Sequence, residues 1–135
     1  MIVDTSALLA LILREPDFER IDEALNRASH PRMSAGTLLE LGILVDRRLP
    51  PAQRARVERL LREYRLQIEP VTEHQAEIGR AAYELFGKGS GSRAQLNFGD
   101  CFAYALAAET GEPLLFVGDD FTHTDLTPAL PTNQR

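Results

Sequence analysis

Met-Ile-Val-Asp-Thr-Ser, residues 1–6, opens the chain with a short apolar run that stops at an acidic side chain and two hydroxyl side chains. Residues 1–3 have the composition of a short β-strand. Thr5 and Ser6 are good N-caps for an apolar helix predicted over residues 7–13. A short strand that passes at once into a helix is typical of α/β folds.

Strands and helices alternate along the rest of the 135 residues. Apolar side chains at helical spacing predict helices over residues 17–29, 35–48, 51–64, 73–86 and 98–110. Short apolar runs predict strands over residues 32–34, 66–69, 113–117 and 126–130. Short apolar strands separated by helices form parallel sheets that are covered on both faces. We therefore predict an α/β fold in one domain, residues 1–135, with a central parallel sheet of about four or five strands and about seven helices.

Composition and charge limit the classes of function. The net charge of −5 argues against a large surface that coats nucleic acid. No apolar run reaches the ~20 residues that span a bilayer. Residues 1–6 lack the basic flank of a signal peptide. We therefore expect a cytoplasmic protein that does not contact membranes.

Four acidic side chains stand among residues that belong in a hydrophobic core. Asp4 ends the first strand, Glu40 lies within an apolar helix, Asp100 opens another, and Asp119 follows Leu-Leu-Phe-Val-Gly, residues 114–118. Burying an isolated carboxylate is unfavourable unless a partner compensates for the lost hydration. A shared hard cation is such a partner, and carboxylates without Cys or His ligands suit Mg²⁺ or Mn²⁺ rather than Zn²⁺.

The positions of these acids along the chain also indicate a site. Asp4 and Asp119 follow predicted strand ends, where ligands bind in parallel α/β sheets. Structural roles are the alternative for each acid: a helix cap for Asp4, a buried Arg partner for Glu40, a first-turn position for Asp100 and an acidic turn for Asp119. Sites of this kind that hold a divalent cation typically perform phosphoryl chemistry.

Several segments together resemble PIN-domain ribonucleases, and most of all the VapC toxins of bacterial type II toxin–antitoxin pairs. The matching segments are Ile-Val-Asp-Thr-Ser-Ala (2–7), Glu40 in an early helix, Leu-Asn-Phe-Gly-Asp-Cys-Phe-Ala-Tyr-Ala-Leu-Ala (96–107) and Pro-Leu-Leu-Phe-Val-Gly-Asp-Asp-Phe (113–121). The resemblance implies a PIN-like fold and a Mg²⁺- or Mn²⁺-dependent endoribonuclease that hydrolyses RNA phosphodiester bonds. It also implies a homodimer, and a VapB-type antitoxin that neutralises the toxin in a hetero-oligomer.

The resemblance extends to individual residues. It assigns Asp4, Glu40 and Asp100 as catalytic metal ligands. Asp119 is expected as the fourth ligand, because it lies nearest the strand end, and Asp120 is the alternative. Ser6 is expected to orient a carboxylate or a water molecule.

Basic residues are candidates for contacts with the RNA backbone. Lys88 and Arg93 flank the Gly- and Ser-rich segment 87–92 and are predicted to bind substrate, and the arginines of residues 47–65 offer a second phosphate track. The helices predicted over residues 17–29 and 35–48 are candidates for the homodimer interface. Two other functions remain open, namely a catalytically silent PIN-like binding module and an aspartate-based phosphotransfer domain.

Overall fold

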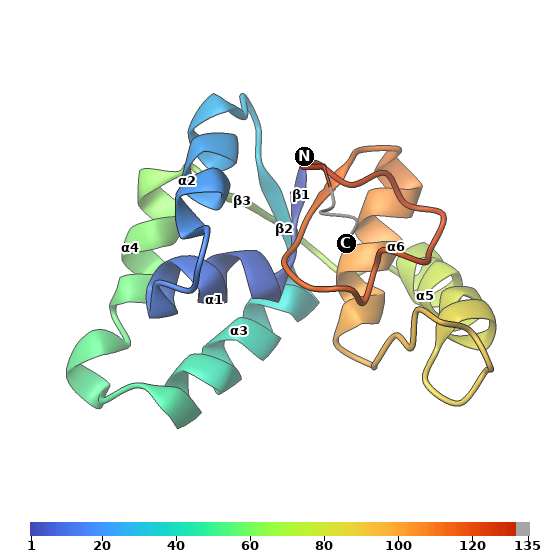
Figure 1. Cartoon of the computed structure of the whole chain (residues 1–135). Helices are drawn as coiled ribbons and strands as arrows, with labels where there is room; N and C mark the ends of the chain where they lie inside the picture. The colour runs from blue at the N-terminus through green and yellow to red at the C-terminus, as the bar shows by residue number, and fades with distance from the viewer. Residues whose placement is uncertain (132–135) are drawn as a thin grey trace.

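The computed structural model describes residues 1–131, in which a four-stranded sheet separates two groups of helices (Figure 1). The strands are β1 (Ile2–Val3), β2 (Arg32–Ser34), β3 (Gln67–Glu69) and β4 (Leu114–Leu115). They lie in the order β3-β2-β1-β4, and every neighbouring pair is parallel. The predicted α/β class and parallel sheet are therefore confirmed.

Helices cover both faces of this sheet, as the sequence predicts. Within the described residues they are α1 (Thr5–Leu13), α2 (Phe18–Arg27), α3 (Ala35–Arg48), the 3₁₀ helix η1 (Pro51–Gln53), α4 (Arg56–Glu63), α5 (Glu73–Phe86) and α6 (Asp100–Thr110). In Figure 1 the helices α1 to α4 lie on one side of the strands, and α5 and α6 lie on the other.

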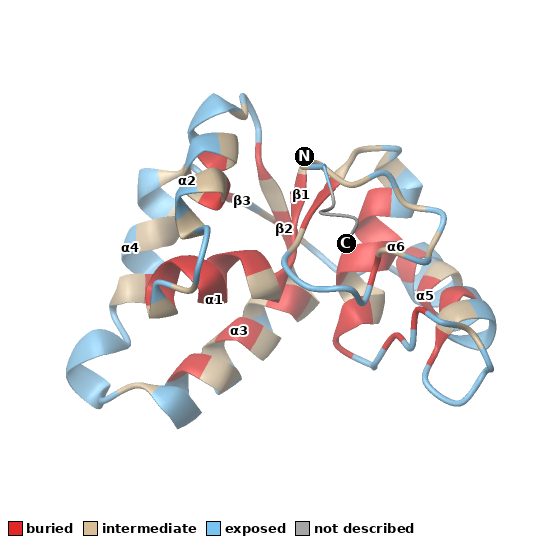
Figure 2. Ribbon diagram, in the orientation of Figure 1, coloured by how far each residue is buried: buried red, intermediate tan, exposed pale blue. Residues whose placement is uncertain are grey.

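The short strands supply side chains to two cores. Val3 and Leu115 pack with α1 to α4, whereas Ile2 and Leu114 pack with α5 and α6. Successive side chains of a strand point to opposite faces, so each two-residue strand contributes one side chain to each core. The helix α1 is buried almost throughout (Figure 2), as expected for a segment with apolar residues on every side.

The structure corrects four details of the sequence prediction. Asp4, not Thr5 or Ser6, is the N-cap of α1, and its side chain accepts a hydrogen bond from the Ser6 N–H group. The helix predicted over residues 51–64 is divided into η1 and α4. The helix predicted from residue 98 begins at Asp100, and the strand predicted over residues 126–130 is a single bridge between Leu114 and Pro128.

The parallel arrangement places several helix starts at one edge of the sheet. The chain leaves β1 into α1 through Asp4, and leaves β2 into α3 through Ser34, which caps that helix. In the described part of the chain, no helix combines the length and apolar character that a bilayer crossing requires.

Candidate active site

Asp4 is a buried carboxylate with only one oxygen satisfied. It is 4% exposed, and its Oδ2 accepts hydrogen bonds from the backbone N–H (3.1 Å) and the hydroxyl (2.7 Å) of Ser6. The other oxygen, Oδ1, is buried and has no hydrogen-bond partner among residues 1–131. Burial raises the pKa of Asp4 from 3.8 to about 6, although the Ser6 hydrogen bonds act in the opposite direction. An ionised Asp4 therefore needs a further partner at Oδ1.

Asp100 is the second buried carboxylate, 5% exposed, in the first turn of α6. The N–H of Asn97 donates to Asp100 Oδ2 (3.0 Å), and the N–H of Asp100 donates to Asn97 Oδ1 (2.9 Å). This reciprocal exchange has the pattern of a capping box. Burial raises the pKa of Asp100 to about 7 against the lowering effect of the Asn97 N–H, and the negative charges of Asp4, Asp120 and Glu40 raise it further.

Glu40 reaches the same region from the second turn of α3. The hydroxyl of Thr5 donates to Glu40 Oε1 over 2.7 Å. The other oxygen, Oε2, lies above the backbone of Gly99, where a Cβ atom would be 1.6 Å away. Glu40 is therefore held between the starts of α1 and α6, and a Cβ atom at position 99 would force its carboxylate to move.

These three carboxylates share one arrangement. One oxygen of each accepts a hydrogen bond from a neighbouring hydroxyl or N–H group, and the other oxygen accepts none within the described residues. No Lys, Arg or His in residues 1–131 forms an ion pair with Asp4, Glu40 or Asp100. The structure therefore offers no buried Arg for Glu40, which was the structural alternative.

The two candidates for the fourth acid differ in their surroundings. Both candidates lie in the segment that follows β4. Ser6 joins that segment to the site, because its hydroxyl accepts a hydrogen bond from the Val117 N–H over 3.0 Å. Asp119 and Asp120 follow, and both are exposed. The charge of Asp120 acts on Asp100, whereas Asp119 lines a neighbouring polar cavity.

The donor set fits a hard divalent cation in its chemistry. All the donors are carboxylates, and Oδ1 of Asp4 is a buried atom without a partner. In the described residues, however, no three His, Cys, Asp or Glu side chains are placed to hold an ion as they stand. Ligation of one ion by these carboxylates therefore requires side-chain rotation.

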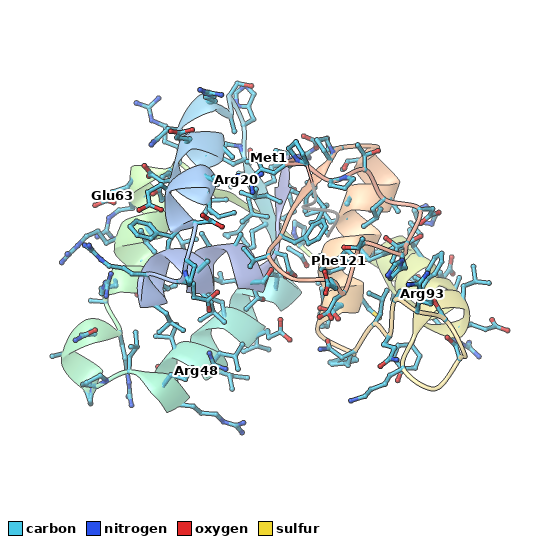
Figure 3. The ribbon with its side chains drawn as sticks, in the orientation of Figure 1. Met1, Arg20, Arg48, Glu63, Arg93 and Phe121 are labelled. Atoms are coloured by element: carbon cyan, nitrogen blue, oxygen red, sulfur yellow. The ribbon has the colours of Figure 1, made fainter. Side chains whose placement is uncertain are left out.

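The predicted substrate-binding residues lie in different surroundings. Arg93 lines the polar cavity, of about 690 Å³, beside the segment 116–119. Lys88 is exposed and is not among the residues of that wall. Arg48, one of the cluster in residues 47–65, lies at the end of α3 remote from Phe121 and Arg93 (Figure 3).

Sequence reasoning missed the roles of three residues that position the carboxylates. Thr5 had been expected as a helix cap, yet its hydroxyl binds Glu40. Asn97 stands three residues before Asp100, which is the spacing of a capping box and a signal that the sequence contains. Nothing local in the sequence identifies Gly99, because the side chain that packs against its backbone, Glu40, lies about sixty residues away in the chain.

Comparison with known proteins identifies the family and the fold of the chain. Residues 1–126 match the model of the PIN domain. Ribonuclease VapC42 of Mycobacterium tuberculosis is 50% identical over 129 residues, which cover 96% of this chain and 98% of that protein. The crystal structure of M. tuberculosis VapC20, a sarcin-ricin loop cleaving toxin, superposes with a TM-score of 0.74 at 19% identity and covers 96% of this chain and 98% of that one.

A chain in a toxin–antitoxin complex from Klebsiella pneumoniae has the same fold. Its TM-score is 0.69 at 18% identity, and the match covers 92% of each chain. At these identities the two solved structures establish the fold, and the family is established by the domain match and by the identity to VapC42. This chain belongs to the PIN-domain family, among the VapC ribonucleases.

Proposed function

We propose that this protein is a metal-dependent endoribonuclease toxin that hydrolyses phosphodiester bonds in RNA. The observation that carries the proposal is the set of three carboxylates, Asp4, Glu40 and Asp100, each of which keeps one oxygen in a local hydrogen bond and leaves the other without a protein donor. Structural carboxylates are usually paired or fully hydrogen-bonded. A cluster without such partners is typical of a cation site.

Asp4, Glu40 and Asp100 would hold the cation, Mg²⁺ or Mn²⁺. We take Asp120 as the fourth carboxylate ahead of Asp119, because the charge of Asp120 acts on Asp100. When bound, such a cation polarises the phosphodiester and makes water a stronger nucleophile.

The chain's own residues restrain the three carboxylates by hydrogen bonds. Ser6 holds Asp4, Thr5 holds Glu40 and Asn97 holds Asp100, with donor–acceptor distances of 2.7, 2.7 and 3.0 Å. These hydrogen bonds restrain one oxygen of each carboxylate, and the side chains would still rotate before all three could hold one ion. The Ser6 hydroxyl also ties the segment after β4 to this site through the Val117 N–H.

Protein partners are part of the proposal. The VapC relatives and the Klebsiella toxin–antitoxin complex support a VapB-type antitoxin that neutralises the enzyme in the cytoplasm. A homodimer stays a prediction, and the structure changes the surface expected for it. The apolar residues Ile21 and Leu25 of α2 are buried in the core, whereas Leu39 and Ile43 of α3 are exposed.

The proposed function is tested by incubating the purified chain with a pool of short RNA oligonucleotides and either Mg²⁺ or Mn²⁺. We expect cleavage by the wild-type chain, loss of cleavage with EDTA, and loss of cleavage in the Asp4→Asn variant, whose fold is checked by circular dichroism. Full cleavage by Asp4→Asn would contradict the proposal. Binding of antitoxin with no RNA cleavage would favour a silent binding module, and labelling by a small phosphodonor would favour a phosphotransfer domain.

A further inference from the structure

Two residues of the polar cavity beside the candidate active site, Arg93 and Asp119, were predicted from the sequence to bind substrate and metal, but the cavity as a whole has no assigned role. Its volume is about 690 Å³, and its walls come from α1, α2, β4, the segment that follows β4, and Arg93. Val117 in this wall donates its N–H to the Ser6 hydroxyl, which itself donates to Asp4. The cavity is therefore linked to the catalytic carboxylates by two consecutive hydrogen bonds.

Two arginines from distant parts of the chain line this cavity. Arg20 lies on α2, and Arg93 lies on the segment before α6. In Figure 3 the two labelled arginines stand on either side of Phe121, which belongs to the segment after β4. Arg20 donates one hydrogen bond to the Pro131 carbonyl (3.3 Å), and Arg93 forms no ion pair within residues 1–131. Guanidinium groups with free N–H donors are well suited to phosphate.

Thr122 supplies a second kind of group. It lines the same cavity, and its Oγ1 atom is buried without a hydrogen-bond partner among the described residues. Buried hydroxyl groups normally find a partner, and rotation of the Thr122 side chain would bring this hydroxyl to the cavity surface, where a ligand can pair with it. A hydroxyl can donate or accept a hydrogen bond, which is the property required to recognise the edge of a nucleic-acid base.

Two carboxylates on the walls limit the nature of the ligand. Asp17 and Asp119 line the cavity together with Arg20 and Arg93. A simple anion would be repelled by the two acids. An RNA strand, in contrast, has phosphates that can pair with the arginines. It also has 2′-hydroxyl and base amino groups that can donate hydrogen bonds to the carboxylates. The volume is in the range of natural ligand pockets and suits a nucleotide.

We propose that this cavity is the subsite for the RNA strand adjacent to the scissile phosphate, and the inference rests on the proposed ribonuclease function. Arg20 and Arg93 contact the phosphates, and the Thr122 hydroxyl reads the edge of one flanking base. Phosphate contacts position a strand and base contacts specify its sequence. Thr122 is therefore a specificity-determining residue, and the arginines are positioning residues.

The test compares the wild-type chain with the Thr122→Val variant and the Arg20→Ala/Arg93→Ala double variant. Each protein cleaves a randomised RNA library in the presence of Mn²⁺, and the released fragments are sequenced. The kinetics of each protein are then measured on the sequence that the wild type prefers. We expect Thr122→Val to reduce the preference at one flanking position by about five- to tenfold, the value of one lost hydrogen bond. The double arginine variant should raise KM more than it lowers kcat and should reduce the salt dependence. Valine has nearly the shape of threonine, and melting curves confirm the fold.

Matched controls separate this subsite from general effects. Thr127→Val and Arg80→Ala, the latter on the exposed side of α5, change the same residue types outside the cavity and should leave preference and KM unchanged. If the wild-type chain cleaves RNA and every variant shows the same sequence preference and the same KM as the wild type, the subsite is overturned and the proposed function stays intact. Absence of wild-type cleavage would overturn both. The subsite would also be wrong if the variants weakened only antitoxin binding, or if a mononucleotide bound tightly without slowing cleavage.

Discussion

The carboxylate of Glu40 lies directly above the backbone of Gly99, so that a Cβ atom on Gly99 would be 1.6 Å from Glu40 Oε2. The backbone of Gly99 has φ −62° and ψ −36°, a conformation open to any residue. The conformation of the chain therefore does not demand glycine here, and a larger residue would instead displace the Glu40 carboxylate. This contact brings α3 and the start of α6 together at the candidate active site.

The first prediction concerns this contact. Gly99→Ala should displace Glu40 and reduce kcat for RNA cleavage by about 100-fold, because a misplacement of about 1 Å has effects of that size. Gly42→Ala on α3 is the matched control, since a Cβ there meets no atom within 4 Å. That change should keep activity and raise the free energy of unfolding by up to about 1 kcal/mol. Equal activity in the two variants would show that the position of Glu40 does not matter.

The second prediction concerns the hydroxyl of Thr5. Thr5→Val keeps the shape of the side chain but removes the donor to Glu40 Oε1, and it should lower kcat while KM changes little. Thr5→Ser keeps the hydroxyl and should recover most of the activity. A Ser variant as weak as the Val variant would assign Thr5 to packing alone, since it is also a buried residue of α1.

A third prediction separates the two neighbouring acids after β4. Asp120→Asn should abolish most cleavage, because the charge of Asp120 acts on Asp100 in the site. Asp119→Asn should keep cleavage and change KM or sequence preference, because Asp119 lines the polar cavity. The two variants are compared in kcat and KM on one RNA. The reverse result would restore Asp119 as the fourth ligand, which is the original expectation from the sequence.

The fourth prediction concerns stability and pH in the absence of divalent cations. Burial raises the pKa of Asp4 to about 6 and that of Asp100 to about 7, from ordinary values of 3.8. Between these values the folded chain binds more protons than the unfolded chain, so the free energy of unfolding falls as the pH rises from 5 to 8. Melting temperatures in EDTA should therefore be lower at pH 8 than at pH 5.

Two additions check the origin of this pH effect. Asp4→Asn removes one of the buried charges and should flatten the decline between pH 5 and pH 8. Mn²⁺ added at pH 8 should raise the melting temperature of the wild-type chain, because a ligand of the folded state stabilises it. A melting temperature that rises steadily from pH 5 to pH 8 in EDTA would contradict the raised pKa values.

Much of the fold follows from local sequence. The strand β2 and the helices α3 and α5 have the predicted limits, because Ser34 and Thr72 cap helices that begin immediately after them. The break between η1 and α4 was not predicted, because the apolar spacing of residues 57–64 continues the helical pattern and conceals it. The last predicted strand reduces to one bridge because, within the described residues 126–131, only Pro128 pairs with Leu114 of β4.

The acidic residues of the site were identifiable because a carboxylate within an apolar run needs an explanation. Asp4 and Asp100 are indeed buried, and Glu40 joins them from α3. The choice between Asp119 and Asp120 could not be made from sequence, because both follow Gly118 in a turn whose direction depends on tertiary packing. The cavity wall formed by Arg20 and Arg93 was equally hidden, since these residues are far apart in the chain.

Calorimetric titration of Mn²⁺ into the wild-type chain and into the Asp4→Asn and Asp100→Asn variants tests most directly whether these carboxylates form one cation site. We expect saturable binding to the wild-type chain at neutral pH and a loss of at least about tenfold in affinity in each variant, because each change removes a charged ligand. Control variants such as Asp46→Asn, on the exposed end of α3, should bind as the wild type does. Equal Mn²⁺ affinity in all four chains would contradict a shared cation site.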